Sequence, residues 1–170
     1  MQRGQTFQMF LLLVAFAAAF VWMTSDSLPA AVASHFGASG VADGFMPRDG
    51  YVRFMLAFVV GLPLFIVGLT TITLGSPRAR INVPHREYWL APERREETVA
   101  FLRLHTVRFG AMLLVFLCFV HWLVVRANQS QPVQLENRWF IGGLVLFIIS
   151  ALVWTKALFD RFRRLPTDPP

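Results

Sequence analysis

The chain alternates between four long apolar runs and three more polar connections. We place the runs at about residues 7–24, 54–75, 106–126 and 139–159. Each run is close to the ~20 residues that a helix needs to cross the ~30 Å hydrocarbon core of a bilayer. Backbone N–H and C=O groups must be bonded internally in lipid, and no alternating strand pattern competes, so we expect four helices. The pattern predicts an all-α fold, an integral membrane four-helix bundle.

The first apolar run also resembles a secretory signal. Arg3 precedes it, and the small residues Ala31–Ala33 follow it. The run is longer than the ~7–15 residues of a signal core. We therefore expect a retained anchor, with residues 1–170 forming a single membrane domain.

Composition favours lipid as the solvent of these runs. Of the 170 residues, 55% are hydrophobic, and 17 are Phe and 5 are Trp. A single water-soluble core does not require this balance. The single Cys118 lies inside the third run, so a disulfide within the chain is excluded. Ionisable residues are nearly absent from the runs, which argues against an ion-driven transporter with a site at the midplane.

The net charge of +6 is distributed unevenly among the connections. Arginines concentrate in residues 76–105 and in the C-terminal tail: Arg78, Arg80, Arg86, Arg94, Arg95, Arg103, Arg161, Arg163 and Arg164. The positive-inside rule then predicts that residues 76–105 and both termini are cytoplasmic, and that residues 25–53 are extracytoplasmic. The basic excess is thus a topology signal and an attraction to lipid headgroups. No nucleic-acid partner is expected.

The extracytoplasmic connection contains the stretch "LPAAVASHFGASGVADGF", residues 28–45. Its glycines permit turns, and Asp43 with Gly44 predicts a tight turn. Its apolar side chains need burial, so we expect a compact cap over the bundle. His35 and Asp43 carry the obvious site chemistry, either as metal ligands or as hydrogen-bonding groups in turns. Their spacing matches no standard zinc pattern, so we predict neither a metal nor a cofactor.

The middle connection contains the stretch "NVPHREYWLAPERREET". Pro92 suits the first turn of a helix, and no strong breaker follows before Arg126, which predicts a rod of roughly 50 Å. One interpretation is an interfacial elbow that positions this helix. The other is a cytoplasmic docking surface made by Tyr88, Trp89, Arg94 and Arg95.

Three short signals lie in or near the runs. Pro63 lacks a backbone donor and predicts a kink in the second helix. Gly142 and Gly143 allow a close helix contact. The sequence "NQS" at 128–130 fits a glycosylation acceptor, although this pattern is frequent by chance.

Two segments together resemble a known family. The outer residues Leu28, Pro29, His35, Phe36, Gly40, Asp43 and Gly44, with the middle stretch quoted above, are similar to a membrane domain of unknown function. That domain is shared with the N-terminal part of the Sdp-type (SdpI-like) immunity proteins. The resemblance implies a multi-pass protein of the bacterial cytoplasmic (inner) membrane. It also implies protection against a secreted peptide toxin and membrane sequestration of a transcriptional repressor.

We consider three functional hypotheses. The first is a non-enzymatic immunity or sensor module that binds a peptide ligand through His35, Phe36, Gly40, Asp43 and Gly44. The second is a small accessory subunit that packs against a membrane-protein partner or forms a homo-oligomer, since the many Phe and Trp side chains on four helices cannot all face inward. The third is an enzyme using His35 and Asp43 with a metal, which we rank last.

Overall fold

The computed structural model describes residues 2–76 and 79–163. Two of the arginines used above, Arg78 and Arg164, lie outside the described residues. The helices are α1 (Gln2–Ser25), α2 (Arg48–Leu56), the π-helical turn η1 (Ala57–Gly61), α3 (Leu62–Gly75), α4 (Arg86–Trp89), α5 (Pro92–Gln129) and α6 (Asn137–Arg163). The strands are β1 (Ala31–Phe36) and β2 (Ala42–Pro47).

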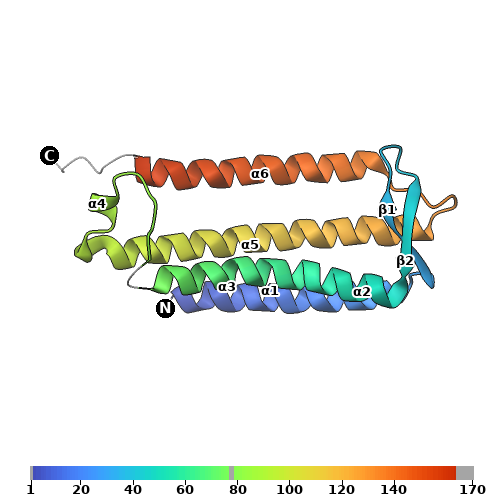
Figure 1. The fold of residues 1–170 in the computed structure, drawn as a ribbon, viewed down its shortest axis with the longest axis horizontal. Helices are drawn as coiled ribbons and strands as arrows, with labels where there is room; N and C mark the ends of the chain where they lie inside the picture. The colour runs from blue at the N-terminus through green and yellow to red at the C-terminus, as the bar shows by residue number, and fades with distance from the viewer. Residues whose placement is uncertain (1, 77–78, 164–170) are drawn as a thin grey trace.

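Within residues 2–76 and 79–163, four helices are long and apolar enough to cross a bilayer, which confirms the prediction of four such helices. They are α1, the continuous helix Arg48–Gly75 built from α2, η1 and α3, then α5 and α6. Strands β1 and β2 depart from the predicted all-α fold, because the segment between the first two of these helices pairs with itself. Figure 1 shows these rods side by side, with the β1–β2 hairpin at one end. The other end, where α1 begins and α6 ends, carries the elbow, residues 79–91. We call these the hairpin end and the elbow end.

The second spanning helix begins earlier than the sequence indicated. It starts at Arg48, whereas hydrophobicity placed its start at residue 54. Arg48 and Arg53 are polar and look like loop, but Asp49 in the first turn suits the positive end of the helix dipole. Hydrophobicity therefore located the part of the helix that suits hydrocarbon and missed its polar first turns.

The irregularity predicted near Pro63 takes the form of a π-helical turn. Ala57–Gly61 forms this turn, which ends two residues before Pro63. Proline has no N–H and its ring crowds the carbonyl one turn earlier. A π turn inserts an extra residue at this point, so the helix continues to Gly75 instead of stopping.

Helix α5 is the centre of the bundle, packing against α1, α3 and α6. Gly110 marks a tight crossing of three helices, because a Cβ atom added there would lie 2.6 Å from Val67 Cγ2 and 3.3 Å from the Phe10 ring. The largest core cluster follows these helices and includes Phe10, Val14, Val21, Val59, Val67, Leu114 and Leu117. The absence of a side chain at residue 110 lets the three helices approach at this level.

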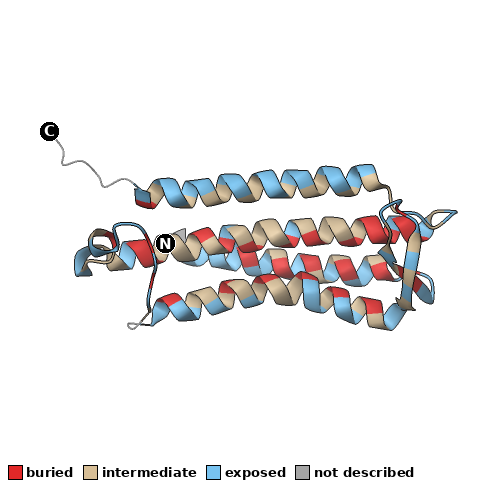
Figure 2. Ribbon diagram, turned by 45° about the horizontal axis from the view of Figure 1, so that its top comes forward, coloured by how far each residue is buried: buried red, intermediate tan, exposed pale blue. Residues whose placement is uncertain are grey.

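Helix α6 lies at the periphery of the bundle. None of its apolar 18-residue window is buried in the chain, and its ribbon in Figure 2 is almost entirely exposed or intermediate. Its buried residue is Phe162, near the C-terminal end, which is 1% exposed. Phe162 packs with Trp89, Val99 and Leu74 in a second core cluster at the elbow end.

The crossing at Gly110 gives a stability prediction. Gly110→Leu should force α1 and α3 away from α5 and cost about 1–3 kcal/mol of stability, as over-packing of a tight core does. Gly68→Leu is the matched control, because a Cβ at Gly68 meets nothing within 4 Å. Thermal unfolding of the detergent-solubilised protein measures both variants. Equal losses would contradict the packing described here.

Candidate functional site

The predicted cap is a β-hairpin rather than an irregular loop. Strands β1 and β2 pair antiparallel, with Val32 opposite Met46 and His35 opposite Gly44. The reversal lies at Gly37–Val41, where the N–H of Gly37 donates to Val41 O and Gly40 adopts a φ of 80°. The prediction of a turn at Asp43 and Gly44 is therefore wrong, because both residues lie within β2.

Gly44 is required in β2 for a different reason. A Cβ atom there would lie 2.8 Å from the His35 Cβ across the pair. Such a distance is too short for two carbon atoms, so the strand needs a residue without a side chain. The absence of a side chain on Gly44 makes room for His35.

The connection between α5 and α6 fixes the tip of the hairpin. The N–H of Leu135 donates to Gly40 O at 2.8 Å, and Asn137 Nδ2 donates to Ala38 O at 2.7 Å. A Cβ on Gly40 would lie 2.4 Å from Leu135 O. Gly40 thus provides both the left-handed turn and the close approach of the second segment.

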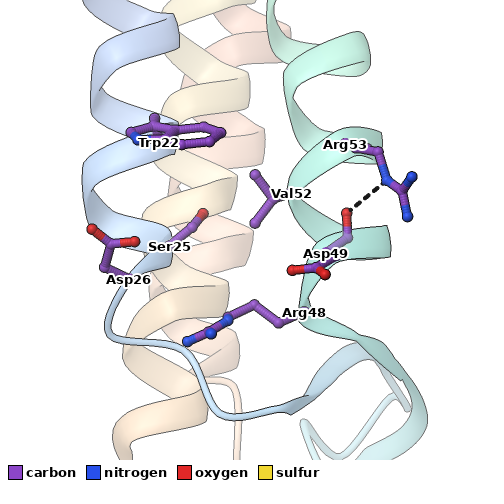
Figure 3. Close-up of a pocket in the computed structure, with 7 residues that line it drawn as sticks. All are labelled: Trp22, Ser25, Asp26, Arg48, Asp49, Val52 and Arg53. Atoms are coloured by element: carbon purple, nitrogen blue, oxygen red, sulfur yellow. Dashed lines mark hydrogen bonds between the residues drawn. The ribbon is translucent and has the colours of Figure 1, made fainter.

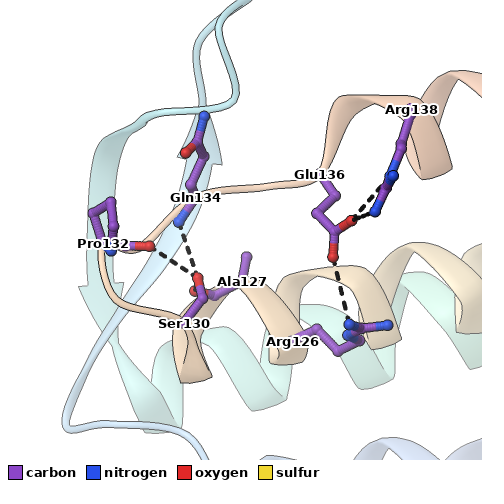
Figure 4. Close-up of polar contacts among 7 residues, drawn as sticks. All are labelled: Arg126, Ala127, Ser130, Pro132, Gln134, Glu136 and Arg138. Atoms are coloured by element: carbon purple, nitrogen blue, oxygen red, sulfur yellow. Dashed lines mark hydrogen bonds and ion pairs between the residues drawn. The ribbon is translucent and has the colours of Figure 1, made fainter.

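The same connection is stiffened by its own polar contacts, drawn in Figure 4. Ser130 Oγ lies 2.8 Å from Ala127 O and accepts from the Gln134 N–H at 3.3 Å. Glu136 accepts from Arg138 at 2.8 Å and from Arg126 at 3.4 Å. The hydrogen bond from Arg138 is the largest cause that lowers the pKa of the Glu136 carboxyl below its usual value.

Asn128 anchors the base of the hairpin to α5. Its Oδ1 accepts from the Ala33 N–H at 2.8 Å, and its Nδ2 donates to Ala33 O at 2.9 Å. The side-chain amide thus bonds β1 as a neighbouring strand would. Nδ2 also donates to Val124 O at 2.9 Å, and the residue is buried. The amide of the "NQS" sequence is therefore a packing group in this fold.

His121 lies on α5 like Asn128, and it connects α5 with α1 and α2. Its Nε2 lies 2.8 Å from Thr24 Oγ1 on α1, and its Nδ1 lies 2.9 Å from the Tyr51 hydroxyl on α2. Thr24 donates its own proton to Phe20 O at 2.6 Å. The Thr24 oxygen must therefore accept from His121 Nε2–H, which leaves Nδ1 to accept from the Tyr51 O–H. In this neutral tautomer every polar atom of the network is bonded.

Above this buried network, His35 and Asp43 form the exposed pair of the hairpin. His35 Nδ1 lies 2.5 Å from Asp43 Oδ1, and the side chains are 75% and 53% exposed. The two side chains bond each other from neighbouring strands, whereas one interpretation of the sequence treated them as hydrogen-bonding groups in turns. Phe36 instead packs against the main core cluster. The five predicted ligand-binding residues thus share one hairpin. Of these five, only His35 and Asp43 are exposed.

A charged recess lies beside the hairpin, between the end of α1 and the start of α2. It has a volume of about 390 Å³, and Figure 3 shows its lining of Trp22, Ser25, Asp26, Arg48, Asp49, Val52 and Arg53. Arg48 donates to Leu28 O at 3.2 Å, and Arg53 Nε donates to Asp49 O at 3.1 Å. Within residues 2–76 and 79–163, no group of three His, Cys, Asp or Glu side chains is placed to hold a metal ion.

The predicted docking residues lie at the elbow end and are largely held by the chain itself. Trp89 is buried, and its ring meets Phe162 edge-on at 5.5 Å between centroids. Arg94 stacks over the Tyr88 ring at 4.1 Å. Arg95 donates to Ser76 O at 3.0 Å. Trp89 therefore contributes to packing, while the other three side chains are partly exposed.

One family matches part of the chain. A domain of unknown function (DUF1648) matches residues 10–66. The match covers most of α1, the hairpin, α2 and the start of α3, and so includes His35 and Asp43. It confirms the resemblance to a domain of unknown function over this region, while the resemblance of the middle stretch and the link to immunity proteins stay predictions. No curated protein and no solved structure matches the chain.

The anchoring of the hairpin gives a second prediction. Asn128→Leu leaves the buried N–H and C=O of Ala33 without their partners, at a cost of about 1–3 kcal/mol. Hydrogen exchange of the Ala33 amide should accelerate by about tenfold or more, since ~1.4 kcal/mol corresponds to tenfold. The control is Gln129→Leu, because Gln129 is exposed and its amide bonds only Ser27 Oγ among the described contacts. An unchanged exchange rate in Asn128→Leu would show that the anchor is elsewhere.

Proposed function

We propose that this chain is a non-enzymatic, multi-pass protein of the bacterial cytoplasmic membrane that binds a secreted peptide at its hairpin. The observation that carries the proposal is the outward-facing His35–Asp43 pair on a hairpin held at both its base and its tip. A fixed platform with exposed polar groups suits recognition, because little ordering is needed on binding. Immunity to a peptide toxin is the role that this binding would serve.

The charge distribution supports an extracytoplasmic hairpin. The described arginines toward the elbow end include Arg80, Arg86, Arg94, Arg95, Arg103, Arg161 and Arg163. Those toward the hairpin end are Arg48, Arg53, Arg126 and Arg138. The positive-inside rule favours the richer end in the cytoplasm, together with both termini.

The backbone of β2 supports an extended peptide as the ligand. Ala33 and Phe45 are opposite each other, and the N–H and C=O of Ala33 bond Asn128 rather than β2. In an antiparallel ladder, two opposite residues that do not bond each other both point their backbone N–H and C=O groups away from the partner strand. The N–H and C=O of Phe45 therefore point to the outer edge of β2. A peptide that adds as a third strand uses such an edge.

The His35–Asp43 pair gives a test in cells. A host lacking this chain should lose tolerance to the peptide fraction of its own spent medium, and the wild-type chain should restore it. Asp43→Asn removes a charged partner from the ligand site and should weaken binding by about tenfold or more, since a hydrogen bond to a charged group contributes about 1.5–3 kcal/mol. The readout is survival against dilution of the peptide fraction.

Glu93→Gln is the matched control, because Glu93 is an exposed acidic residue in the first turn of α5, at the elbow end and away from the hairpin. It should protect as well as the wild type. Equal survival of the deletion strain and the complemented strain would contradict the immunity role.

The second candidate is an accessory subunit, favoured by the position of α6. The apolar window of this helix has no buried residue in the chain, so a partner helix has a full face to contact. A stoichiometric membrane partner retained in mild detergent would support this role.

A further inference from the structure

An apolar groove runs between α5 and α6 on the side of the bundle away from the recess described above. Its volume is about 700 Å³, within the ~300–1,000 Å³ typical of sites for small lipophilic ligands. The walls come from Ala111, Met112, Val115, Phe116 and Phe119 of α5 and from Trp139, Gly142, Gly143, Leu146, Phe147 and Ser150 of α6. The polar atom at its inner end, Ser150 Oγ, is already bonded to Leu146 O at 2.8 Å.

Phe116 and Phe119 of α5 both pack closely against α6 along the groove. Phe116 stacks on Phe147 with 4.5 Å between centroids. A Cβ atom on Gly143 would lie 2.2 Å from the Phe119 ring, so α6 approaches α5 closely there. Gly142 is different, because a Cβ there meets nothing within 4 Å. The groove is thus a built feature with free space at Gly142.

The groove is about as long as half of the hydrocarbon core of a bilayer is thick. From Trp139 to Ser150, α6 rises by about 16 Å at ~1.5 Å per residue. This is close to half of the ~30 Å hydrocarbon core. One turn further on, His105 and Trp154 close the space, since Trp154 Nε1 donates to His105 O at 2.9 Å and the rings stack at 4.4 Å. A transmembrane helix needs the full thickness, whereas one acyl chain fits a single leaflet.

The mouth of the groove at the hairpin end is cationic. Arg138 lies over the Trp139 ring at 5.8 Å, and Arg126 lies over the Trp122 ring at 5.0 Å. Both guanidinium groups share the carboxylate of Glu136, so the cluster of three keeps one net positive charge. Arg138 is 79% exposed on its side chain and can bond a phosphate oxygen without moving away from Glu136.

From the depth, lining and charge of the groove, we propose that it binds one phospholipid of the hairpin-side leaflet. One acyl chain lies along Gly142 toward Ser150, and the anionic headgroup lies at Arg138. This site is separate from the peptide site on the hairpin and does not depend on the proposed function.

Native mass spectrometry of the full chain tests this site. The detergent-solubilised protein is mixed with vesicles of equal parts phosphatidylglycerol and phosphatidylcholine, and the retained lipids are identified. We expect one retained phospholipid per chain, with anionic phosphatidylglycerol favoured. Gly142→Phe fills the free space and should lower retention by about tenfold, which corresponds to ~1.4 kcal/mol. Ser150→Phe fills the inner end and provides a second variant should the first fail to fold.

Ile141→Phe is the matched control, since Ile141 lies at the same depth, is 56% exposed and does not line the groove. It should retain lipid as the wild type does. Arg138→Gln should keep the lipid but lose the preference for phosphatidylglycerol. Wild-type retention in both groove-filling variants would overturn the proposal. So would a wild-type dimer that Gly142→Phe separates into monomers, because a second copy would then cover the groove.

Discussion

The whole arrangement depends on one constraint: inside hydrocarbon, every backbone N–H and C=O must find its partner within the protein. The four long helices meet this requirement along their length. The hairpin does not, because a two-stranded sheet leaves an edge open on each strand. The β1 edge is bonded at Ala33 by Asn128, and the tip is bonded at Gly40 by Leu135. The hairpin therefore belongs at the aqueous end of the bundle, where its remaining groups meet water.

Two buried polar side chains of α5, His121 and Asn128, hold the helices together and attach the hairpin to them. His121 and Asn128 are seven residues apart on α5, so they lie two turns apart on the same face of the helix. His121 joins α1 and α2 through Thr24 and Tyr51, and Asn128 receives the hairpin. One helix face thus first fixes the three-helix core and then positions the strand above it. The exposed His35–Asp43 pair gains its fixed location from these buried groups.

The sequence predicted the elements that depend on hydrophobic length, and it missed those that depend on pairing. The four spanning helices follow from apolar runs alone, and α5 begins at Pro92 as expected. The hairpin was not predicted, because Gly37, Gly40 and Gly44 made the segment look like a series of turns. Only the contact of Gly40 with Leu135, and that of Gly44 with His35, distinguishes a turn glycine from a strand glycine. Such contacts join segments far apart in the chain, so no local pattern reveals them.

The candidate site divides in the same way. His35 and Asp43 were found because their side chains stand out in an apolar stretch, and they do form a pair. Asn128, Tyr51 and His121 were missed as a network, although the signal existed: two polar residues seven apart on α5. Trp89 was one of the four residues of the candidate docking surface, but its ring packs edge-on against Phe162 from the end of α6. Burial by a distant helix is the information that the local sequence lacks.

Cysteine labelling of the two ends tests the account most directly. In a Cys118→Ala background, Ser39→Cys places a thiol at the tip of the hairpin, and Glu93→Cys places one in the exposed first turn of α5. A membrane-impermeant maleimide should label Ser39→Cys in intact spheroplasts and should label Glu93→Cys only after the membrane is permeabilised. The reverse pattern, with Ser39→Cys protected and Glu93→Cys labelled from outside, would contradict the proposed orientation and the hairpin as a site for a secreted peptide.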